Sequence, residues 1–289
     1  MGDKTMNQNL KTIVRGAYDI QKLRIQMGNR IVSNFKSKLG QDPGKSEQTL
    51  DAEGKKIIGN LRTHYKKITD GVTTFPRQAT FKGDEVISNY TELCLISQYY
   101  DLEESEKQHF SRLGKILKGY DVYTEFLEQI KGVGPAMAGV IISEIDITKA
   151  KYPSSLWKYA GLDVCNGEGR SRRAEHLTEY EYTNRDGEQA TRKGITFNPF
   201  LKTKLTGVLA SSFLRAGDHK YSRIYNDYKH RLETSPAHAE KSKGHRHNMA
   251  MRYMIKMFLV DLYFNWRTIA GLPISKTYHE SKQGHVHAA

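Results

Sequence analysis

The segment Lys131-Gly132-Val133-Gly134-Pro135 combines residue types that can hold a phosphate group. Glycine permits positive φ and a close approach of the backbone to a ligand, and proline is favoured at the first position of a helix. The N–H groups and the dipole at a helix start attract anions. We therefore predict a helix-hairpin-helix element that binds DNA phosphates through Lys131, Gly132, Val133, Gly134 and Ala136. The alternative is a plain packing joint that uses the same glycines.

Further basic residues are candidates for phosphate contacts because they gather in three short stretches. One stretch follows two glycines, one lies on an expected β-hairpin, and one lies at the start of an expected long helix. These residues are Arg170, Arg172, Arg173, Arg192, Lys193, His245, Arg246 and Arg252. Contacts of this kind position a protein on nucleic acid without selecting a base sequence. The alternative for each stretch is a solvated surface.

Tyrosines alternate with basic residues between positions 218 and 233. Tyr221, Tyr225 and Tyr228 share one face of the helix that we expect there. Aromatic rings with basic neighbours can stack on exposed bases. A tyrosine stripe at helical spacing more often belongs to a core, and we expect that role here.

Candidates for covalent chemistry or for metal binding are few. Ser171 and Cys165 are weak candidates for a nucleophile in the stretch after Leu162. His245 and His247, like His285 and His287, would point apart on a helix, and no carboxylate lies close in sequence, so we expect no metal site there. We expect no cofactor, with Mg²⁺ required only if the chain cleaves strands.

The charge distribution favours a polyanionic partner. The 289 residues carry a net charge of +13. Residues 1–150 hold 22 Lys and Arg against 19 Asp and Glu, whereas residues 151–289 hold 23 against 13. A basic half of this size binds nucleic acid through counterion release. We expect duplex or branched DNA as the partner, and charge alone leaves RNA open.

The chain should be mainly α, a helical array with the helix-hairpin-helix element and a small β-hairpin insertion. Apolar periodicity predicts helices over 10–39, 46–69, 85–100, 103–130, 154–162, 199–216, 218–233 and 245–269. Asp101 is a plausible cap for the fourth of these. An Asp-Gly turn at 186–187 predicts the hairpin. We expect a helical N-terminal domain over 1–123 and a basic C-terminal domain over 124–289.

Two cysteines far apart, Cys94 and Cys165, give neither a zinc spacing nor a disulfide framework. The first ten residues lack the apolar core of a signal peptide, and no apolar run reaches the ~20 residues of a membrane span. These features predict a cytoplasmic protein without a membrane partner.

Residues from about Phe126 to Phe213 resemble the C-terminal domain of the Piv-type DNA invertases and the related DEDD insertion-sequence transposases. The resemblance rests on IKGVGPAMAGVIISEI and on Tyr159-Ala160-Gly161-Leu162 some 25 residues later. It implies a prokaryotic, phage or mobile-element setting. Members of the family also carry an RNase H-like domain with metal-binding acids and a serine nucleophile after the Gly-Leu segment. Residues 1–120 show no pattern for that domain, and Ser171 is displaced from the expected position.

These observations predict a DNA-binding protein related to transposases and recombinases that holds the phosphate backbone largely independently of sequence. One alternative is an active transposase, recombinase or nuclease. Another is a phage or mobile-element protein that acts through protein–protein contacts. The apolar stripe on the N-terminal helices makes a homodimer a further possibility.

Overall fold

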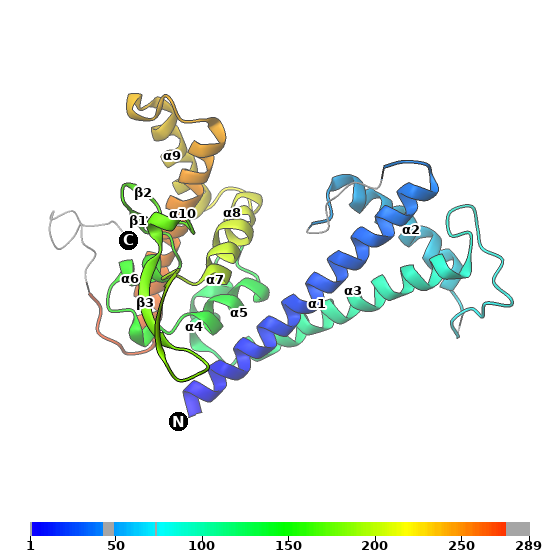
Figure 1. The fold of residues 1–289 in the computed structure, drawn as a ribbon, viewed down its shortest axis with the longest axis horizontal. Coiled ribbons are helices and arrows are strands. Elements are labelled where there is room, and N and C mark those ends of the chain that lie inside the picture. The colour runs from blue at the N-terminus through cyan, green and yellow to red at the C-terminus, as the bar shows by residue number, and fades with distance from the viewer. Residues whose placement is uncertain (1, 43–48, 73, 276–289) are drawn as a thin grey trace. The chain divides into compact units, whose positions relative to one another are not determined.

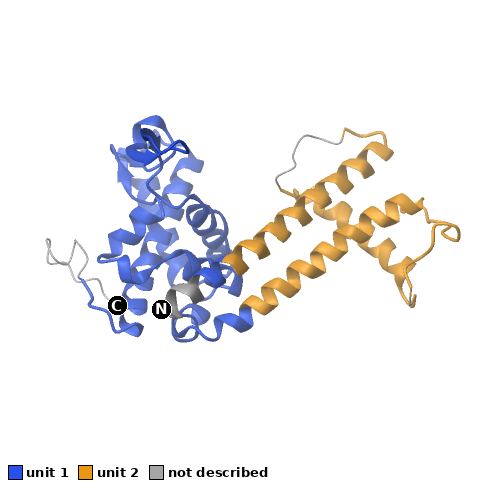
Figure 2. Cartoon of the chain, turned by 60° about the horizontal axis from the view of Figure 1, so that its bottom comes forward, with its two compact units in different colours: residues 1–11, 114–289 blue, residues 12–113 orange. Residues whose placement is uncertain are grey.

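The structure is a computed structural model that describes residues 2–42, 49–72 and 74–275. The chain divides into two compact units, which Figure 2 colours separately. Unit 1 comprises residues 1–11 and 114–289, and unit 2 comprises residues 12–113. Within the described residues the fold is mainly helical with two small antiparallel strand pairs (Figure 1), which confirms the predicted fold class.

The described residues of unit 2 form three helices. They are α1 (Gly2–Lys38), whose first residues belong to unit 1, α2 (Ala52–Thr69) and α3 (Tyr90–Leu117). The predicted break near residue 102 was wrong, because α3 runs through it without a Gly or Pro and Asp101 lies inside the helix. Residues 85–89 also precede the helix instead of belonging to it. Glu103, expected near the turn, forms an ion pair with Arg62 of α2, and Glu106 forms one with Arg24 of α1.

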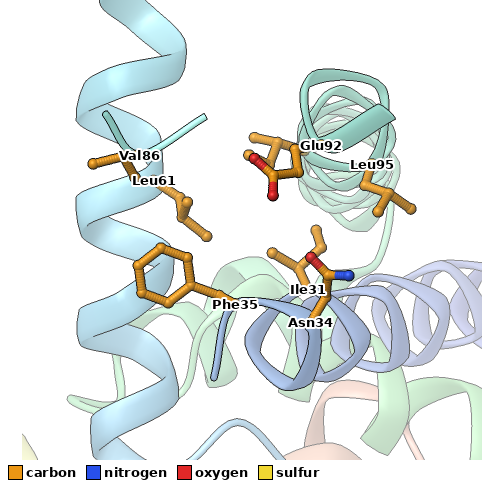
Figure 3. A pocket seen from close by; sticks show the side chains of 8 residues that line it. Ile31, Asn34, Phe35, Leu61, Val86, Glu92 and Leu95 are labelled. Carbon is orange, nitrogen blue, oxygen red and sulfur yellow. The ribbon is translucent and has the colours of Figure 1, made fainter. Parts of the chain in front are cut away.

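The core of unit 2 lies where the three helices meet. Buried Ile31, Leu61, Ile87 and Ile96 come from α1, α2, the loop before α3 and α3 itself. A gap of only about 20 Å³ remains next to Ile31, Leu61 and Ile96, and Figure 3 shows Phe35 at its edge. Ligand pockets have volumes of about 300–1,000 Å³, so this gap is a packing void.

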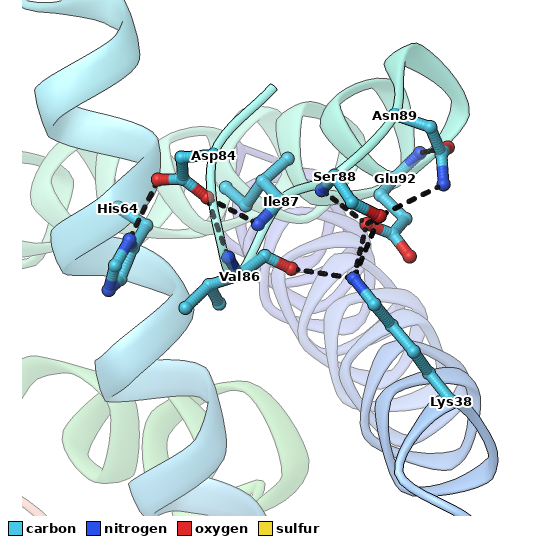
Figure 4. Close-up of polar contacts among 8 residues, drawn as sticks. All are labelled: Lys38, His64, Asp84, Val86, Ile87, Ser88, Asn89 and Glu92. Atoms are coloured by element: carbon cyan, nitrogen blue, oxygen red, sulfur yellow. Dashed lines mark hydrogen bonds and ion pairs between the residues drawn. The ribbon is translucent and has the colours of Figure 1, made fainter. Parts of the chain in front are cut away.

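The loop before α3 is fixed by the carboxylate of Asp84 (Figure 4). It accepts hydrogen bonds from the backbone N–H groups of Val86 at 2.8 Å and Ile87 at 2.6 Å, and it lies 2.7 Å from His64 Nδ1. Lys38 Nζ donates to the Val86 carbonyl at 2.9 Å. These contacts hold the side chain of Ile87, which is fully buried, in the core.

Unit 1 contains the GVGP segment and the long C-terminal helix. Its first elements are α4 (Asp121–Glu125), the 3-10 turn η1 (Leu127–Gln129), α5 (Pro135–Glu144), η2 (Ile147–Lys149) and α6 (Pro153–Tyr159). The expected continuous helix up to Ile130 was wrong, since α3 ends at Leu117, residues 118–120 form a turn, and the chain leaves α-helical geometry again at Phe126. Helix α5 begins at Pro135 as predicted, and every residue from Met137 to Glu144 is buried.

The strands form two separate pairs. β1 (Val164–Cys165) pairs with β2 (Glu168–Gly169), and β3 (Thr178–Thr183) pairs with β4 (Gln189–Gly194). The short 3-10 turn η3 (Ala174–His176) lies between them. The second pair is the predicted hairpin, and Gly187 has the positive φ of 83° that its turn requires.

Helices complete the unit. α7 (Pro199–Thr203), the π-helical η4 (Lys204–Leu209) and α8 (Ala210–Arg215) form one helical segment, followed by α9 (Lys220–Thr234), η5 (Pro236–His238) and α10 (Lys243–Ile269). Helices α9 and α10 pack side by side (Figure 1). Tyr221 stacks on Phe213 with ring centroids 4.7 Å apart, and Phe258 of α10 packs edge-on against both rings. No helix among the described residues is long and apolar enough to cross a membrane.

Candidate nucleic-acid interface

One face of α10 lines a large cleft in unit 1. Its residues are spaced by three or four along the helix, which puts them on a single stripe; they are His245, Asn248, Met249, Arg252, Tyr253 and Lys256. The opposite face of α10 carries fully buried side chains, including Met254 and Phe258. The core therefore fixes which face of α10 is presented to the cleft.

The segment from Leu162 to Arg173 supplies the other wall. It contains the β1–β2 pair, whose turn uses Asn166 at φ 52° and Gly167 at φ 78°. A side chain at Gly169 would place its Cβ 2.9 Å from the guanidinium carbon of Arg252. Arg252 also donates from Nη2 to the carbonyl of Gly161 at 3.4 Å. The absence of a side chain at Gly169 thus leaves room for Arg252 beside the β1–β2 pair.

The cleft is large and basic. Its volume is about 780 Å³, within the usual range for ligand sites. Among the residues that the structure describes, the lining contains one carboxylate, that of Glu168, against four lysines and arginines: Arg173, Lys241, Arg252 and Lys256. The lining therefore favours an anionic ligand.

The positive charges near the cleft are crowded. Burial, followed by the charges of Arg252, Arg170 and Arg172, lowers the pKa of Lys202 to about 8, although Asp163 acts in the opposite direction. Burial and Arg252 likewise lower the pKa of Lys256. A bound anion stabilises protonated lysine, so it would oppose both shifts.

Two tyrosines form part of the cleft lining. Tyr228 of α9 and Tyr253 of α10 are stacked, with ring centroids 4.1 Å apart and an interplanar angle of 11°. Lys256 lies over the ring of Trp157, at 5.3 Å from the centroid. As expected, Tyr221 and Tyr225 are buried in the core, whereas Tyr228 is half-buried.

Ser171 lines the cleft and contacts a buried histidine. Its Oγ lies 2.9 Å from Nδ1 of His176, and its backbone N–H donates to the same nitrogen at 3.0 Å. Because a backbone N–H can only donate, Nδ1 acts as the acceptor in the 3.0 Å contact, and its single lone pair is shared with the Ser171 hydroxyl. Cys165, the other weak candidate, is half-buried in β1.

A set of possible metal ligands lies beside this contact. Glu168, Glu175 and His176 each have one ligand atom within 4.8 Å of the others. Arg173 already pairs with both carboxylates, at 2.5 Å from Glu168 and 3.7 Å from Glu175. The set fits a cation such as Mg²⁺ poorly, because the ion would have to displace a guanidinium from both acids.

Some of the predicted basic residues line the cleft in the structure, and others do not. Arg173, His245 and Arg252 line the cleft. Arg170 is bound to Asp163 by two 2.9 Å hydrogen bonds and is largely buried, so it supports the wall. Arg172 is exposed outside the lining, and Arg246 donates to the carbonyl of His238 at 3.3 Å.

The GVGP turn contributes no residue to the cleft lining. Gly132 has φ 96°, and a Cβ there would lie 2.9 Å from the ring of buried Phe213, so this glycine serves close packing. Val133 is buried, and Ala136 is half-buried. Lys131 and Gly134 are exposed, with nothing within 4 Å of a Cβ at Gly134. Only the exposed part of the turn is available to a ligand.

The β3–β4 hairpin presents its own basic residues. The guanidinium of Arg192 lies 5.0 Å from the ring centroid of Tyr180 and 4.7 Å from that of Tyr182. Lys193 is exposed on the same strand. Neither basic residue lines the cleft.

Sequence reasoning missed several lining residues of the cleft, namely Lys241, Asn248, Met249 and Tyr253. A signal for most of them was present, because positions 245, 248, 249, 252, 253 and 256 share one helical face. The contact between Ser171 and His176 was also missed, although the two residues are close in sequence.

Comparison with known families gives one match, over residues 124–180, to the family described as Transposase IS116/IS110/IS902 family. No curated protein and no solved structure shows significant similarity to the chain. The matched residues include α5, α6 and the cleft wall from Leu162 to Arg173. The match supports a transposase-related protein and suggests DNA as its partner.

Proposed function

We propose that unit 1 is a DNA-binding module, related to the C-terminal domains of Piv-type invertases and DEDD transposases, that holds the phosphate backbone in this cleft. The observation that carries the proposal is the stripe on α10, which brings Arg252 and Lys256 opposite Arg173. Lysine and arginine recognise phosphates by charge and by hydrogen bonds. Such contacts carry little base information, so binding is largely independent of sequence.

The test removes cleft charge without touching the packed Arg252. The double variant Lys241→Gln/Lys256→Gln is compared with Lys55→Gln/Lys56→Gln, two exposed lysines on α2 that give the same change in net charge. The cleft variant should weaken duplex binding and reduce the salt slope by about 0.9 for each phosphate that is no longer neutralised. The control should behave as wild type. Equal affinities for the cleft variant and the wild type would contradict the proposal. Tighter binding of RNA than of DNA would identify RNA as the ligand instead.

A second candidate is a strand-cleaving enzyme, which the contact between Ser171 and His176 favours. In such a reaction Ser171 Oγ attacks phosphorus and its proton passes to His176 Nδ1. The phosphorus–oxygen bond to the leaving strand then breaks, the leaving oxygen takes the proton from His176 and becomes a free hydroxyl, and the other strand stays joined to serine through its phosphate. Supercoiled plasmid incubated with Mg²⁺ or Mn²⁺ provides the assay. Nicking that Ser171→Ala abolishes would support the enzyme, and an absence of nicking by the wild type would leave DNA binding alone.

A further inference from the structure

The cleft combines a stacked aromatic pair with adjacent positive charge. Tyr253 lies between Arg252 and Lys256 on the stripe of α10, and Tyr228 supports its ring from α9. Both rings are half-buried and line the cleft. Phosphate binding alone requires no aromatic residue, so the proposed duplex grip leaves this pair unexplained.

We propose that the cleft receives an unpaired nucleotide of a DNA strand, with its base stacked on the Tyr228–Tyr253 pair and its phosphates at Arg252 and Lys256. This inference rests on the proposed function and specifies its substrate. Bases stack on aromatic side chains that lie beside a basic groove, and this preference is the chemical reason for the proposal. The shape of the base, more than its hydrogen-bonding edge, would then decide occupancy.

The size of the cleft favours one nucleotide over a duplex. A volume of about 780 Å³ suits a single small ligand, whereas a duplex is thick enough to take a whole α-helix into its major groove alone. A duplex can therefore lie across the rim, but only a single-stranded or extruded nucleotide can enter. Extrusion is least costly at a mismatch, a bulge or a strand end.

The other residues that line the cleft can contact both the apolar and the polar parts of a base. Val164 and Met249 offer apolar surface, and the Asn248 amide and the Ser171 hydroxyl offer hydrogen-bonding groups. The two rings are already parallel, with an angle of 11° between them. A ring held in place before binding loses little rotamer freedom when the base arrives, which favours affinity.

The experiment uses the full chain and a duplex that carries one bulged 2-aminopurine, whose fluorescence falls when the base stacks. Wild type should quench the probe and bind the bulged duplex more tightly than the matched perfect duplex. Tyr253→Leu removes the π face and should weaken bulged binding by about 5- to 140-fold, with the quench lost. Tyr253→Phe keeps the ring and should retain both effects.

Thermal melting of each variant tests whether loss of the ring has damaged the fold, and Tyr228→Leu provides an independent disruption of the pair. Equal losses on bulged and perfect duplex, or a retained quench in both leucine variants, would overturn the stacking proposal while leaving the phosphate grip intact. A failure of the proposed phosphate binding would give a different result: the Lys241→Gln/Lys256→Gln variant would bind every DNA with the affinity of the wild type. Deoxyadenosine monophosphate is added as a competitor, and displacement of DNA at micromolar concentration would assign the cleft to a free nucleotide instead.

Discussion

Removal of the Asp84 carboxylate should loosen the start of α3 selectively. Asp84→Ala leaves the N–H groups of Val86 and Ile87 without their acceptor, and Ile87 has no exposed surface through which water could replace it. An unsatisfied buried donor costs about 1–3 kcal/mol. Two of them, one only partly buried, give about 2–4 kcal/mol. Asp84→Asn keeps an acceptor oxygen and should cost about 1 kcal/mol through the lost charge.

Hydrogen exchange of peptides covering residues 84–96 measures this local effect directly. Protection there should fall roughly 30- to 700-fold for the alanine variant, since about 1.4 kcal/mol corresponds to a factor of ten. Both tryptophans, Trp157 and Trp266, belong to unit 1, so tryptophan fluorescence would miss the change. Asp101→Asn, at an exposed position within α3, is the matched control. Unaltered protection in Asp84→Ala, or equal losses for alanine and asparagine, would refute the reasoning.

The same carboxylate makes this region acid-sensitive. Burial acts to raise the pKa of Asp84, but hydrogen bonds from the Ile87 N–H, His64 and the Val86 N–H outweigh it and hold the pKa below its usual value. A group with a depressed pKa stabilises the fold above its unfolded pKa of about 3.9 and loses that contribution as the pH falls through the folded value. The Asp84→Asn variant does not titrate at this position, so between about pH 4 and the folded pKa of Asp84 its free energy of unfolding should fall less than that of the wild type.

Three further substitutions test unit 1. Gly161→Ala would place a Cβ 2.6 Å from the ring of Phe197 at φ 64°, so it should lower the free energy of unfolding by about 2–4 kcal/mol, as measured by tryptophan fluorescence. Gly167→Ala, at φ 78° with open space, should lower it by only about 1 kcal/mol, and equal losses for the two variants would contradict the packing argument. Arg267→Ala should destabilise the unit by about 2–4 kcal/mol, because this buried guanidinium donates to three backbone carbonyls, and calorimetry that shows no change would exclude that role. Lys131→Glu should weaken DNA binding uniformly across unrelated sequences if the exposed turn contacts phosphate, and unchanged mobility shifts would leave the turn a packing joint.

Local sequence signals predicted the elements whose cause is local. Pro135 begins α5, and Gly161, with φ 64°, follows α6. Asp186-Gly187 forms the turn of the β3–β4 hairpin. In each case the residue's own backbone preference determines the geometry, so tertiary contacts were not needed to place it.

The boundary errors arose where tertiary contacts override local pattern. Acidic residues near position 102 suggested a turn, but Glu103 and Glu106 pair with arginines on neighbouring helices, and α3 continues. The helix before Lys131 was expected to be continuous, whereas it ends at Leu117, resumes at Asp121 and is followed after Phe126 by a 3-10 turn. Ion pairs between helices cannot be recognised from one segment alone.

The cleft was predictable only in part. Arg173 and Arg252 were identified as basic residues, but their convergence depends on the close approach of Arg252 to Gly169, across some 80 residues of chain. Arg170 has the same residue type, yet Asp163 holds it in the wall. Charge thus indicated the class of ligand, and packing decided which charges face it.

Lysine footprinting of the wild-type chain tests the cleft as the DNA site most directly. The chain is acetylated briefly with and without DNA that carries a bulged nucleotide, and the modified positions are quantified by mass spectrometry. The cleft account predicts that DNA protects Lys241 and Lys256 while Lys55 and Lys56 on α2 remain as reactive as before. Protection of Lys131 alone, with Lys241 and Lys256 unaffected, would place the contact at the GVGP turn and contradict the account.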